Sequence, residues 1–406
     1  MTRSRIDLLD IFLLIGSLMA LGISVLAAGS MSVIAFVNNF LQLLEDAQAA
    51  WSIALIFTGM GLLTLPGLYL SYRSIEGRPA PVSRSISPLA FILGLGFPLA
   101  LGLGEISRQF DLLSFILEPL AHVIAAVTPM LFMSLYVVRQ LPLIPWRRIW
   151  GSFTGGLWLS PMIALVVELL AAIPILLLLF TYVFNEIDPR ELIEPFASGA
   201  PLDESSIGAQ LELLLSQPLL VVSAILFVSV LVPLIEELIK TVALWPMLRR
   251  GMPSLYAFTG GVIAGGAYGL FEAFFLVQPG EGWVTLMVAR AGATIMHMIT
   301  TGMASLGLAL ALKTKRWKTG LRYYLYAVLL HGVWNLAALG VGAAYLSSEA
   351  GETATAVNGL DAVVLASGGL LFLLAAGAVF GLHAFPRHLL TRQATESFHD
   401  ASGVES

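Results

Sequence analysis

The acid and base side chains best suited to chemistry lie in the C-terminal half of the sequence, inside long apolar stretches. Two adjacent glutamates are followed closely by a lysine, and a third glutamate, an arginine, two histidines and an asparagine come in the next three stretches. Ionisable groups are costly inside a bilayer unless they are paired or line a cavity, which makes them functional candidates. The candidate site residues are Glu236, Glu237, Lys240, Glu272, Arg290, His297, His331 and Asn335.

These residue types suit hydrolysis of a peptide bond, which needs an activated water and a group that stabilises the oxyanion. Two neighbouring carboxylates repel one another, so one of Glu236 and Glu237 can act as general base while Lys240 balances the charge of the other. Either histidine can orient the water or donate a proton. Asn335 can donate a hydrogen bond to the oxyanion.

A metal-dependent version assigns the same groups differently. His297, His331 and Glu272 would then be the three protein ligands of an open Zn²⁺ site, with a neighbouring glutamate as base. The chain contains no cysteine, which excludes thiolate catalysis and cysteine-ligated metal, and it has no His-Glu-x-x-His motif. Because the histidines lie in separate stretches and two glutamates are adjacent, metal-free hydrolysis is favoured over zinc as the cofactor.

Polar side chains repeat at helical spacing within these stretches. Residues three or four apart share a helix face, and this step separates Tyr268 from Glu272 and His331 from Asn335. A rise of about 1.5 Å per residue, counted from the basic helix ends, places the candidate residues about 14 to 25 Å deep. We therefore expect them to converge on one buried, hydrated site, in which Arg290 neutralises Glu272.

The elements that must position these residues are transmembrane helices. Hydrophobic residues make up 58% of the chain and charged residues only 12%, and the mean hydropathy is +0.88. A soluble domain has about twice this charged fraction. The sequence predicts an all-α, polytopic transmembrane bundle of about ten spans, since about 20 apolar residues cross a bilayer. The expected spans are 7–28, 51–71, 87–105, 112–138, 149–183, 217–247, 255–277, 283–312, 322–346 and 360–384.

The charges of the connecting segments alternate along the chain. Basic residues precede the first span and recur in every second loop, as in 313–322, whereas 186–212 and 349–361 are acidic. The positive-inside rule then places both termini in the cytoplasm, and we expect an integral protein of the plasma (inner) membrane. The first apolar run contains Asp10 and is long, which favours a retained span over a cleaved signal peptide.

Five regions follow from this pattern. Two of them are polar, an acidic extracytoplasmic loop and a cytoplasmic tail at the C-terminus. The others are an N-terminal five-span region, a four-span catalytic core and a last span. The expected limits are 1–183 for the first five spans, 184–216 for the loop, 217–346 for the core, 347–385 for the last span and 386–406 for the tail.

Glycine recurs every four residues in the seventh apolar stretch, at Gly261, Gly265 and Gly269. This small-xxx-small spacing lets helix backbones approach closely. Tight helix packing alone accounts for these glycines, and the same approach can bring Glu272 against the sixth stretch.

The pattern as a whole resembles the PrsW-like intramembrane proteases, which are related to the CAAX-processing and Abi membrane proteases. The resemblance covers roughly residues 225–345 and rests on Glu-Glu-x-x-Lys at Glu236, aromatic-x-x-x-Glu at Tyr268, the histidine at 297 and His-x-x-x-Asn at His331. The first five expected spans lie outside it. Two positions depart from the family pattern, with Tyr268 in place of Phe and Ala273 in place of Asn. The resemblance implies an intramembrane endopeptidase, of glutamate or metallo type.

Partners follow from the same reasoning. The bilayer surrounds the protein, the substrate is expected to be a membrane protein or peptide, and nothing indicates nucleic-acid binding or a particular oligomeric state. Two other classes fit buried Glu, His and Lys residues. An ion-coupled transporter would use them as a proton relay, although the internal repeats typical of transporters are missing. A non-catalytic membrane scaffold is the third class, but it would not need intact acid and imidazole groups.

Overall fold

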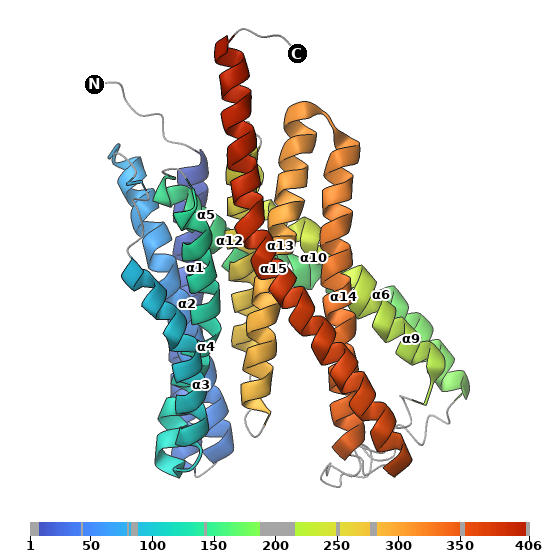
Figure 1. Ribbon diagram of the computed structural model, residues 1–406. Helices are drawn as coiled ribbons and strands as arrows, with labels where there is room; N and C mark the ends of the chain where they lie inside the picture. The colour runs from blue at the N-terminus through green and yellow to red at the C-terminus, as the bar shows by residue number, and fades with distance from the viewer. Residues whose placement is uncertain are drawn as a thin grey trace. The chain divides into compact units, whose positions relative to one another are not determined.

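The computed structural model describes residues 8–41, 44–78, 81–82, 88–141, 144–186, 216–248, 252–276, 282–349 and 354–402, and these residues are almost entirely helical (Figure 1). Nine helices within these ranges are long and apolar enough to cross a membrane, which confirms the predicted polytopic bundle. The elements that precede the acidic loop are α1 (Leu8–Phe40), α2 (Leu44–Ile75), η1 (Pro88–Leu95), α3 (Gly96–Ser107), α4 (Asp111–Arg139), α5 (Trp146–Thr154), η2 (Gly155–Leu159) and α6 (Ser160–Glu186).

The second half of the chain supplies the remaining helices. Residues 187–215, which form most of the expected acidic loop, lie outside the described residues. The elements that follow them are α9 (Pro218–Leu226), η3 (Phe227–Leu231), α10 (Val232–Ile239), η4 (Lys240–Leu244), α11 (Trp245–Leu248), α12 (Ser254–Phe275), α13 (Trp283–Thr314), α14 (Trp317–Glu349) and α15 (Ala354–Ser402).

These helices form two compact units. One unit, called unit 1 here, comprises 1–161, 237–327 and 375–406, and the other, unit 2, comprises 162–236 and 328–374. One boundary falls between Glu236 and Glu237, two neighbours on α10. The candidate site residues are therefore described unit by unit.

The interior of unit 1 is organised around α12 and α13, which pack closely and run antiparallel (Figure 1). A Cβ atom at Gly265 would lie 2.2 Å from the His297 carbonyl oxygen, and one at Gly261 would lie 2.5 Å from that of Thr301. Only glycine tolerates such an approach. The glycine repeat therefore packs as predicted from its spacing, and its partner is the helix that carries His297 rather than the sixth apolar stretch.

One expected span is not a single long helix. Residues 87–105 were expected to cross the bilayer, but this segment forms the 3₁₀ helix η1 followed by the 12-residue α3. At about 1.5 Å per residue α3 is about 18 Å long, which is short of the about 30 Å hydrocarbon core. The cause is local, because Pro98 lacks the backbone N–H that would bond to residue 94, and the neighbouring glycines disfavour a regular helix.

The helical segment that carries the glutamate pair is interrupted on both sides of the pair. A π-helical turn, η3, precedes α10, and a 3₁₀ turn, η4, begins at Lys240. Pro233 explains the first interruption, because it has no N–H for the carbonyl of Ser229. Irregular turns of this kind inside helices are frequent at functional sites.

The last helix is longer than expected. The final span was expected to end at 384, whereas α15 continues to Ser402 and contains Pro386. Most of the predicted polar tail is thus part of this helix. The reason is that 387–402 contains no glycine or further proline to end it, and its leucines, arginines and alanines favour helix.

Candidate active site

Glu237 is the most enclosed acid of unit 1, with a side chain that is 0% exposed. One carboxylate oxygen accepts hydrogen bonds from Lys240 Nζ at 3.0 Å and Thr300 Oγ1 at 3.0 Å, and the other accepts one from Thr301 Oγ1 at 3.2 Å. The lysine pairing follows from the three-residue step along the helix. Three donors thus satisfy both oxygens of the buried Glu237 carboxylate.

Lys240 connects this charge to the imidazole of His297. Its ammonium nitrogen lies 2.8 Å from His297 Nδ1 and 4.4 Å from the centroid of the Tyr268 ring. The Tyr268 ring also meets the His297 ring edge to face, with centroids 5.7 Å apart. Because an ammonium group only donates hydrogen bonds, Nδ1 acts as the acceptor and the ring proton resides on Nε2. The ammonium group of Lys240 thus selects one tautomer of His297.

Glu272 contacts the other nitrogen of the His297 ring. His297 Nε2 lies 3.0 Å from Glu272 Oε2, and Arg290 donates a hydrogen bond to the same oxygen. The Glu272 side chain is 24% exposed, in contrast to the fully buried Glu237. Glu272 is therefore the more accessible of the two acids of this cluster.

These contacts form one continuous chain of groups within unit 1, called the proton-transfer cluster here. It runs through Glu237, Lys240, His297, Glu272 and Arg290. Negative and positive groups alternate on either side of a neutral imidazole, so the charges cancel. This cancellation is what allows so many ionisable groups to be buried, since buried charges are tolerated when paired and hydrogen-bonded.

Unit 2 holds a second carboxylate and imidazole. Glu236 Oε2 and His331 Nε2 lie 3.8 Å apart, and both side chains are buried. This separation is within ion-pair range but beyond that of a direct hydrogen bond. The two residues adjacent in sequence, Glu236 and Glu237, therefore have different imidazole environments and are not equivalent.

Asn335 lies on the same helix as His331 and contacts the irregular turn that precedes the glutamates. Its Nδ2 donates to the Val228 carbonyl at 2.9 Å, inside η3. A Cβ atom at Gly332 would lie only 2.2 Å from the Ser229 carbonyl oxygen, so α14 packs directly on this turn. His331 and Asn335 thus both face the segment that carries the glutamates, as their spacing predicted. The Asn335 amide bonds to the Val228 carbonyl, which in a regular helix would accept a hydrogen bond from a backbone N–H of the same helix.

Sequence reasoning missed one residue of these clusters. Thr300 was not singled out, although its hydroxyl reaches Glu237 one helical turn beyond His297. The only available signal was that spacing, which is weak because buried threonines commonly bond to their own helix. The expected neutralisation of Glu272 by Arg290 is present, and Lys240 pairs with Glu237.

Imidazole and carboxylate groups are the donors available to a metal. A catalytic zinc site uses about three protein ligands, and within the described residues no such set of imidazole and carboxylate atoms gathers inside either unit alone. In unit 1 the two nitrogens of His297 face Lys240 and Glu272, and Arg290 is also close, so two cations already occupy the places next to these donors. The proton-transfer cluster as it stands suits proton handling better than cation binding.

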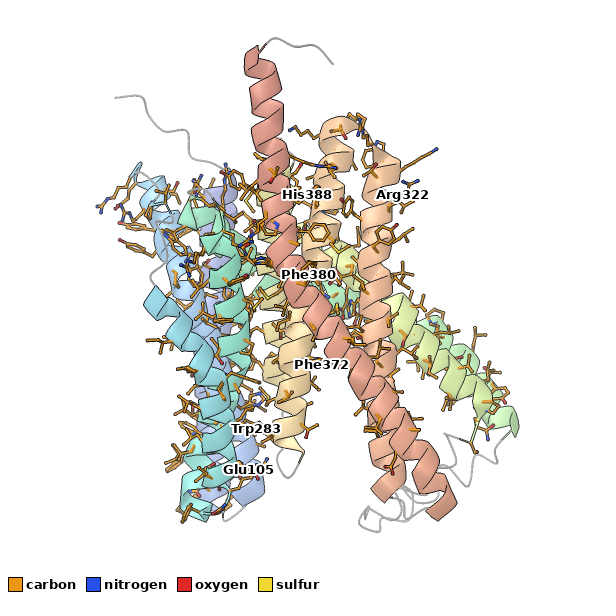
Figure 2. All side chains as sticks on the ribbon, viewed as in Figure 1. Glu105, Trp283, Arg322, Phe372, Phe380 and His388 are labelled. Carbon is orange, nitrogen blue, oxygen red and sulfur yellow. The ribbon has the colours of Figure 1, made fainter. Side chains whose placement is uncertain are left out.

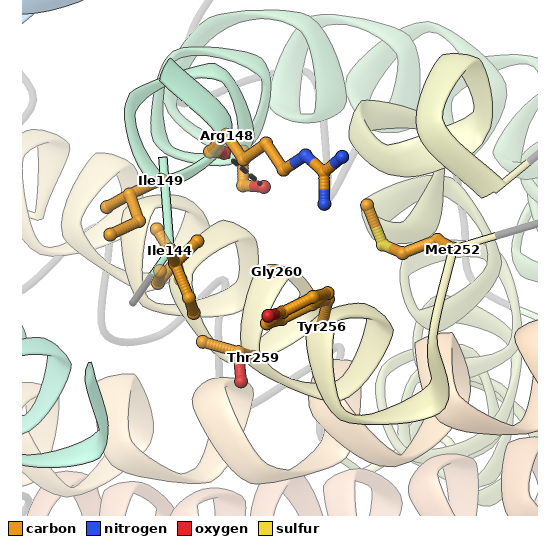
Figure 3. A pocket seen from close by; sticks show the side chains of 9 residues that line it. Ile144, Arg148, Ile149, Met252, Tyr256, Thr259 and Gly260 are labelled. Carbon is orange, nitrogen blue, oxygen red and sulfur yellow. Dashed lines mark hydrogen bonds between the residues drawn. The ribbon is translucent and has the colours of Figure 1, made fainter. Parts of the chain in front are cut away.

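A recess in unit 1 lies between the start of α5 and the first turns of α12 (Figure 3). It is shallow and open, and it is lined by apolar side chains such as Ile149, Met252 and Ile263. Arg148 is the charged residue of the lining, and its guanidinium carbon lies 5.7 Å from the centroid of the Tyr256 ring. The lining contains no carboxylate or imidazole, so the recess supplies no acid–base chemistry.

An integral helical bundle with a buried cluster of carboxylate, imidazole and ammonium groups is the construction expected of an intramembrane hydrolase. The chain belongs to the PrsW family of intramembrane metalloproteases, whose family model matches residues 144–358. Neither the curated proteins nor the solved structures gave a match to the chain.

The matched region is larger than the resemblance seen in the sequence, which began near residue 225. It contains every candidate site residue and also the fifth expected span, at 149–183. Only the first four expected spans precede it. The chain is therefore an integral membrane protein of a protease family, with an N-terminal extension to the family region formed by α1 to α4.

Proposed function

We propose that this protein is an endopeptidase that hydrolyses a peptide bond of a membrane-associated protein or peptide, using carboxylate and imidazole groups to activate water. The observation that carries the proposal is the contact between His297 and Glu272, which joins a partly exposed carboxylate to a histidine of defined tautomer. Membership of the protease family gives this acid–base pair its reaction class.

In the proposed reaction Glu272 is the general base that accepts a proton from water. Its second oxygen, Oε1, is the acceptor, since Oε2 is bonded to His297 and Arg290. Arg290 and the Nε2–H of His297 hold Glu272 in place, and the guanidinium of Arg290 supplies positive charge as the oxyanion forms. Lys240, which is paired with Glu237, donates a hydrogen bond to His297 Nδ1 and thereby keeps the ring proton on Nε2. This assignment favours Glu272 over the adjacent glutamate pair considered from sequence.

Glu236 and His331 are proposed as a second proton-handling pair, with Asn335 positioning the helix that carries His331. A carboxylate close to an imidazole can fix the orientation of the ring. A carboxylic acid or an imidazolium group can donate the proton that the leaving amine requires. The substitutions below test whether this pair takes part in the reaction.

A metal-dependent version of this mechanism is the alternative, because the family is one of metalloproteases. The imidazoles of His297 and His331 and the nearby glutamate carboxylates are the available donors, and Glu272 with the two histidines was the set expected from sequence. A zinc ion, when bound, would lower the pKa of its water and polarise the peptide carbonyl. The metal-free alternative needs only the protein groups described above.

His297→Ala and His331→Ala are expected to insert normally and to lose cleavage of a membrane-embedded reporter, by about 100- to 10,000-fold if each handles a proton. Metal content of the purified wild type and both variants is measured on the same samples. Stoichiometric zinc that disappears with either substitution identifies a ligand, and activity that resists chelators with no bound metal identifies the metal-free mechanism.

Full cleavage by both histidine variants would contradict the proposed chemistry. Substrate-free proton uptake by the reconstituted wild type, driven by an imposed gradient and absent from His297→Ala, would favour the transporter instead.

The proposed orientation has both termini in the cytoplasm and is tested by labelling single cysteines, since the chain has none of its own. Cysteines at Ser205 and Glu352 should react with an impermeant reagent in intact cells, and those at Thr319 and Ser397 should not. The first two positions lie outside the described residues, and the orientation rests on the distribution of basic loops. The reverse labelling pattern would overturn it.

A further inference from the structure

His122 joins the two ends of the connection between α12 and α13. The histidine belongs to α4, in the part of the chain that precedes the family match, and its side chain is buried. Its Nε2 lies 3.3 Å from the carbonyl oxygen of Phe274, and its Nδ1 accepts a hydrogen bond from Trp283 Nε1 at 3.2 Å. Phe274 is in the last turn of α12, and Trp283 is the first residue of α13.

The chemistry of the two partners defines the state of His122. An indole N–H only donates and a carbonyl only accepts, so Nδ1 is unprotonated and Nε2 carries the hydrogen. The last four carbonyls of a helix have no partner within the helix, and His122 satisfies one of them for α12. A single rigid ring thus makes both bonds and sets the spacing between the end of one helix and the start of the next.

Trp283 is itself held in place by the α3 segment. A Cβ atom at Gly104 would lie 2.5 Å from the Trp283 ring, so the ring packs directly on the α3 backbone. On another side, the guanidinium carbon of Arg108 lies 5.8 Å from the centroid of the same ring. Figure 2 shows Trp283 at the end of unit 1 that also carries Glu105. The indole donor therefore has little freedom to move away from His122.

The helix ends that His122 joins, at Phe274 and Trp283, are called the clamp here together with His122. They lie close in sequence to the proposed catalytic groups on each helix. Glu272 precedes Phe274 by two residues on α12, and Arg290 follows Trp283 by two helical turns on α13. A shift of one helix end against the other would change the contacts of Glu272 with Arg290 and His297. Such a shift matters, because a misplacement of about 1 Å can lower a rate by about 100-fold.

We infer that His122 is a positioning residue, which acts through the ends of α12 and α13 to hold Glu272 in register with Arg290 and His297. The inference rests on the proposed function for its effect on catalysis. It also assigns a role to the N-terminal extension, since α3 and α4 provide the clamp and lie outside the family match.

Three substitutions of His122 separate the two bonds from the volume of the ring. His122→Gln places an amide nitrogen near Nε2 and can still donate to Phe274, His122→Asn places an amide oxygen near Nδ1 and can still accept from Trp283, and His122→Phe makes neither bond. We expect His122→Phe to lower kcat about 10- to 100-fold with KM little changed. His122→Gln should restore most of kcat, and His122→Asn should restore less.

The matched control is His383→Phe. His383 Nδ1 also makes a hydrogen bond between helices of unit 1, to Tyr136, but contacts neither end of the α12–α13 connection. Its loss should leave kcat unchanged. A purely structural role for His122 would instead give equal losses of folded protein for both phenylalanine variants, a normal kcat for the protein that folds, and no rescue by glutamine. That result would overturn the inference.

A second measurement does not depend on cleavage. Spin labels at cysteines replacing Phe275 and Val288, two exposed positions on α12 and α13, report the spacing of the helix ends by dipolar electron paramagnetic resonance. His122→Phe should broaden the distance distribution, and His122→Gln should keep it narrow. Broadening in a chain that cleaves no substrate would support the clamp and refute the proposed function, whereas an unchanged distribution would refute the clamp.

Discussion

Glu272→Gln is expected to abolish measurable cleavage, with a loss of about 100- to 10,000-fold, the usual contribution of a general base. Gln keeps the volume of Glu and can still accept hydrogen bonds from His297 and Arg290 through its oxygen, but it cannot accept a proton from water at neutral pH. The protein should insert and unfold as the wild type does. Single-turnover cleavage of a membrane-embedded reporter by purified, reconstituted protein measures the loss.

Asp10→Asn is the matched control for this substitution. Asp10 is buried in the same unit and is also a carboxylate paired with an arginine, since Arg147 Nη1 lies 2.6 Å from Asp10 Oδ1. Loss of its charge tests the general effect of breaking a carboxylate–arginine pair, and the cleavage rate of the folded protein should not change. Wild-type cleavage by Glu272→Gln would remove Glu272 from the mechanism and return the adjacent glutamates as candidates.

Lys240→Met is expected to affect stability as well as activity. Lys240 and Glu237 are both 0% exposed and lie 3.0 Å apart, so removal of the ammonium leaves a buried carboxylate without its main countercharge. Breaking a buried pair in this way costs about 3–5 kcal/mol. Unfolding of the purified protein in detergent measures the change, and an arginine at this position should retain part of the activity because it keeps the charge.

The double variant Glu237→Gln with Lys240→Met separates stability from chemistry. It removes both charges at once, so most of the lost stability should return, while cleavage should stay low because His297 Nδ1 no longer faces an ammonium group. The single variant Glu237→Gln completes the double-mutant cycle, which gives the interaction energy between Glu237 and Lys240. If Lys240→Met cleaves as the wild type does, the proposed control of the His297 tautomer is wrong.

Part of the site could be predicted from the sequence because it depends on local spacing and composition. A glutamate three residues before a lysine can reach it within one turn of helix, and Glu237 and Lys240 do so. His331 and Asn335 share a helix face for the same reason. Glycine at every fourth position predicted a close helix contact, although the periodicity does not name the partner helix.

Other features depend on helices far apart in the sequence. The proton-transfer cluster requires the rotation of α12 and α13 about their axes to be known, which decides that His297 lies between Lys240 and Glu272. The contact of Asn335 with a carbonyl of η3 depends on an irregular turn, and this turn follows from the missing N–H of Pro233 only once the helix is packed.

The sequence by itself determined that the chain is a polytopic helical membrane protein and which acids, bases and amide are available for chemistry, because hydropathy and helical periodicity are local properties. The tertiary structure alone decided that Thr300 contacts the Glu237 carboxylate, and that His122 reaches the ends of α12 and α13. The physical reason is that a buried polar group takes whichever partner the packed helices bring within about 3 Å of it, and short-range patterns carry no information about partners on other helices.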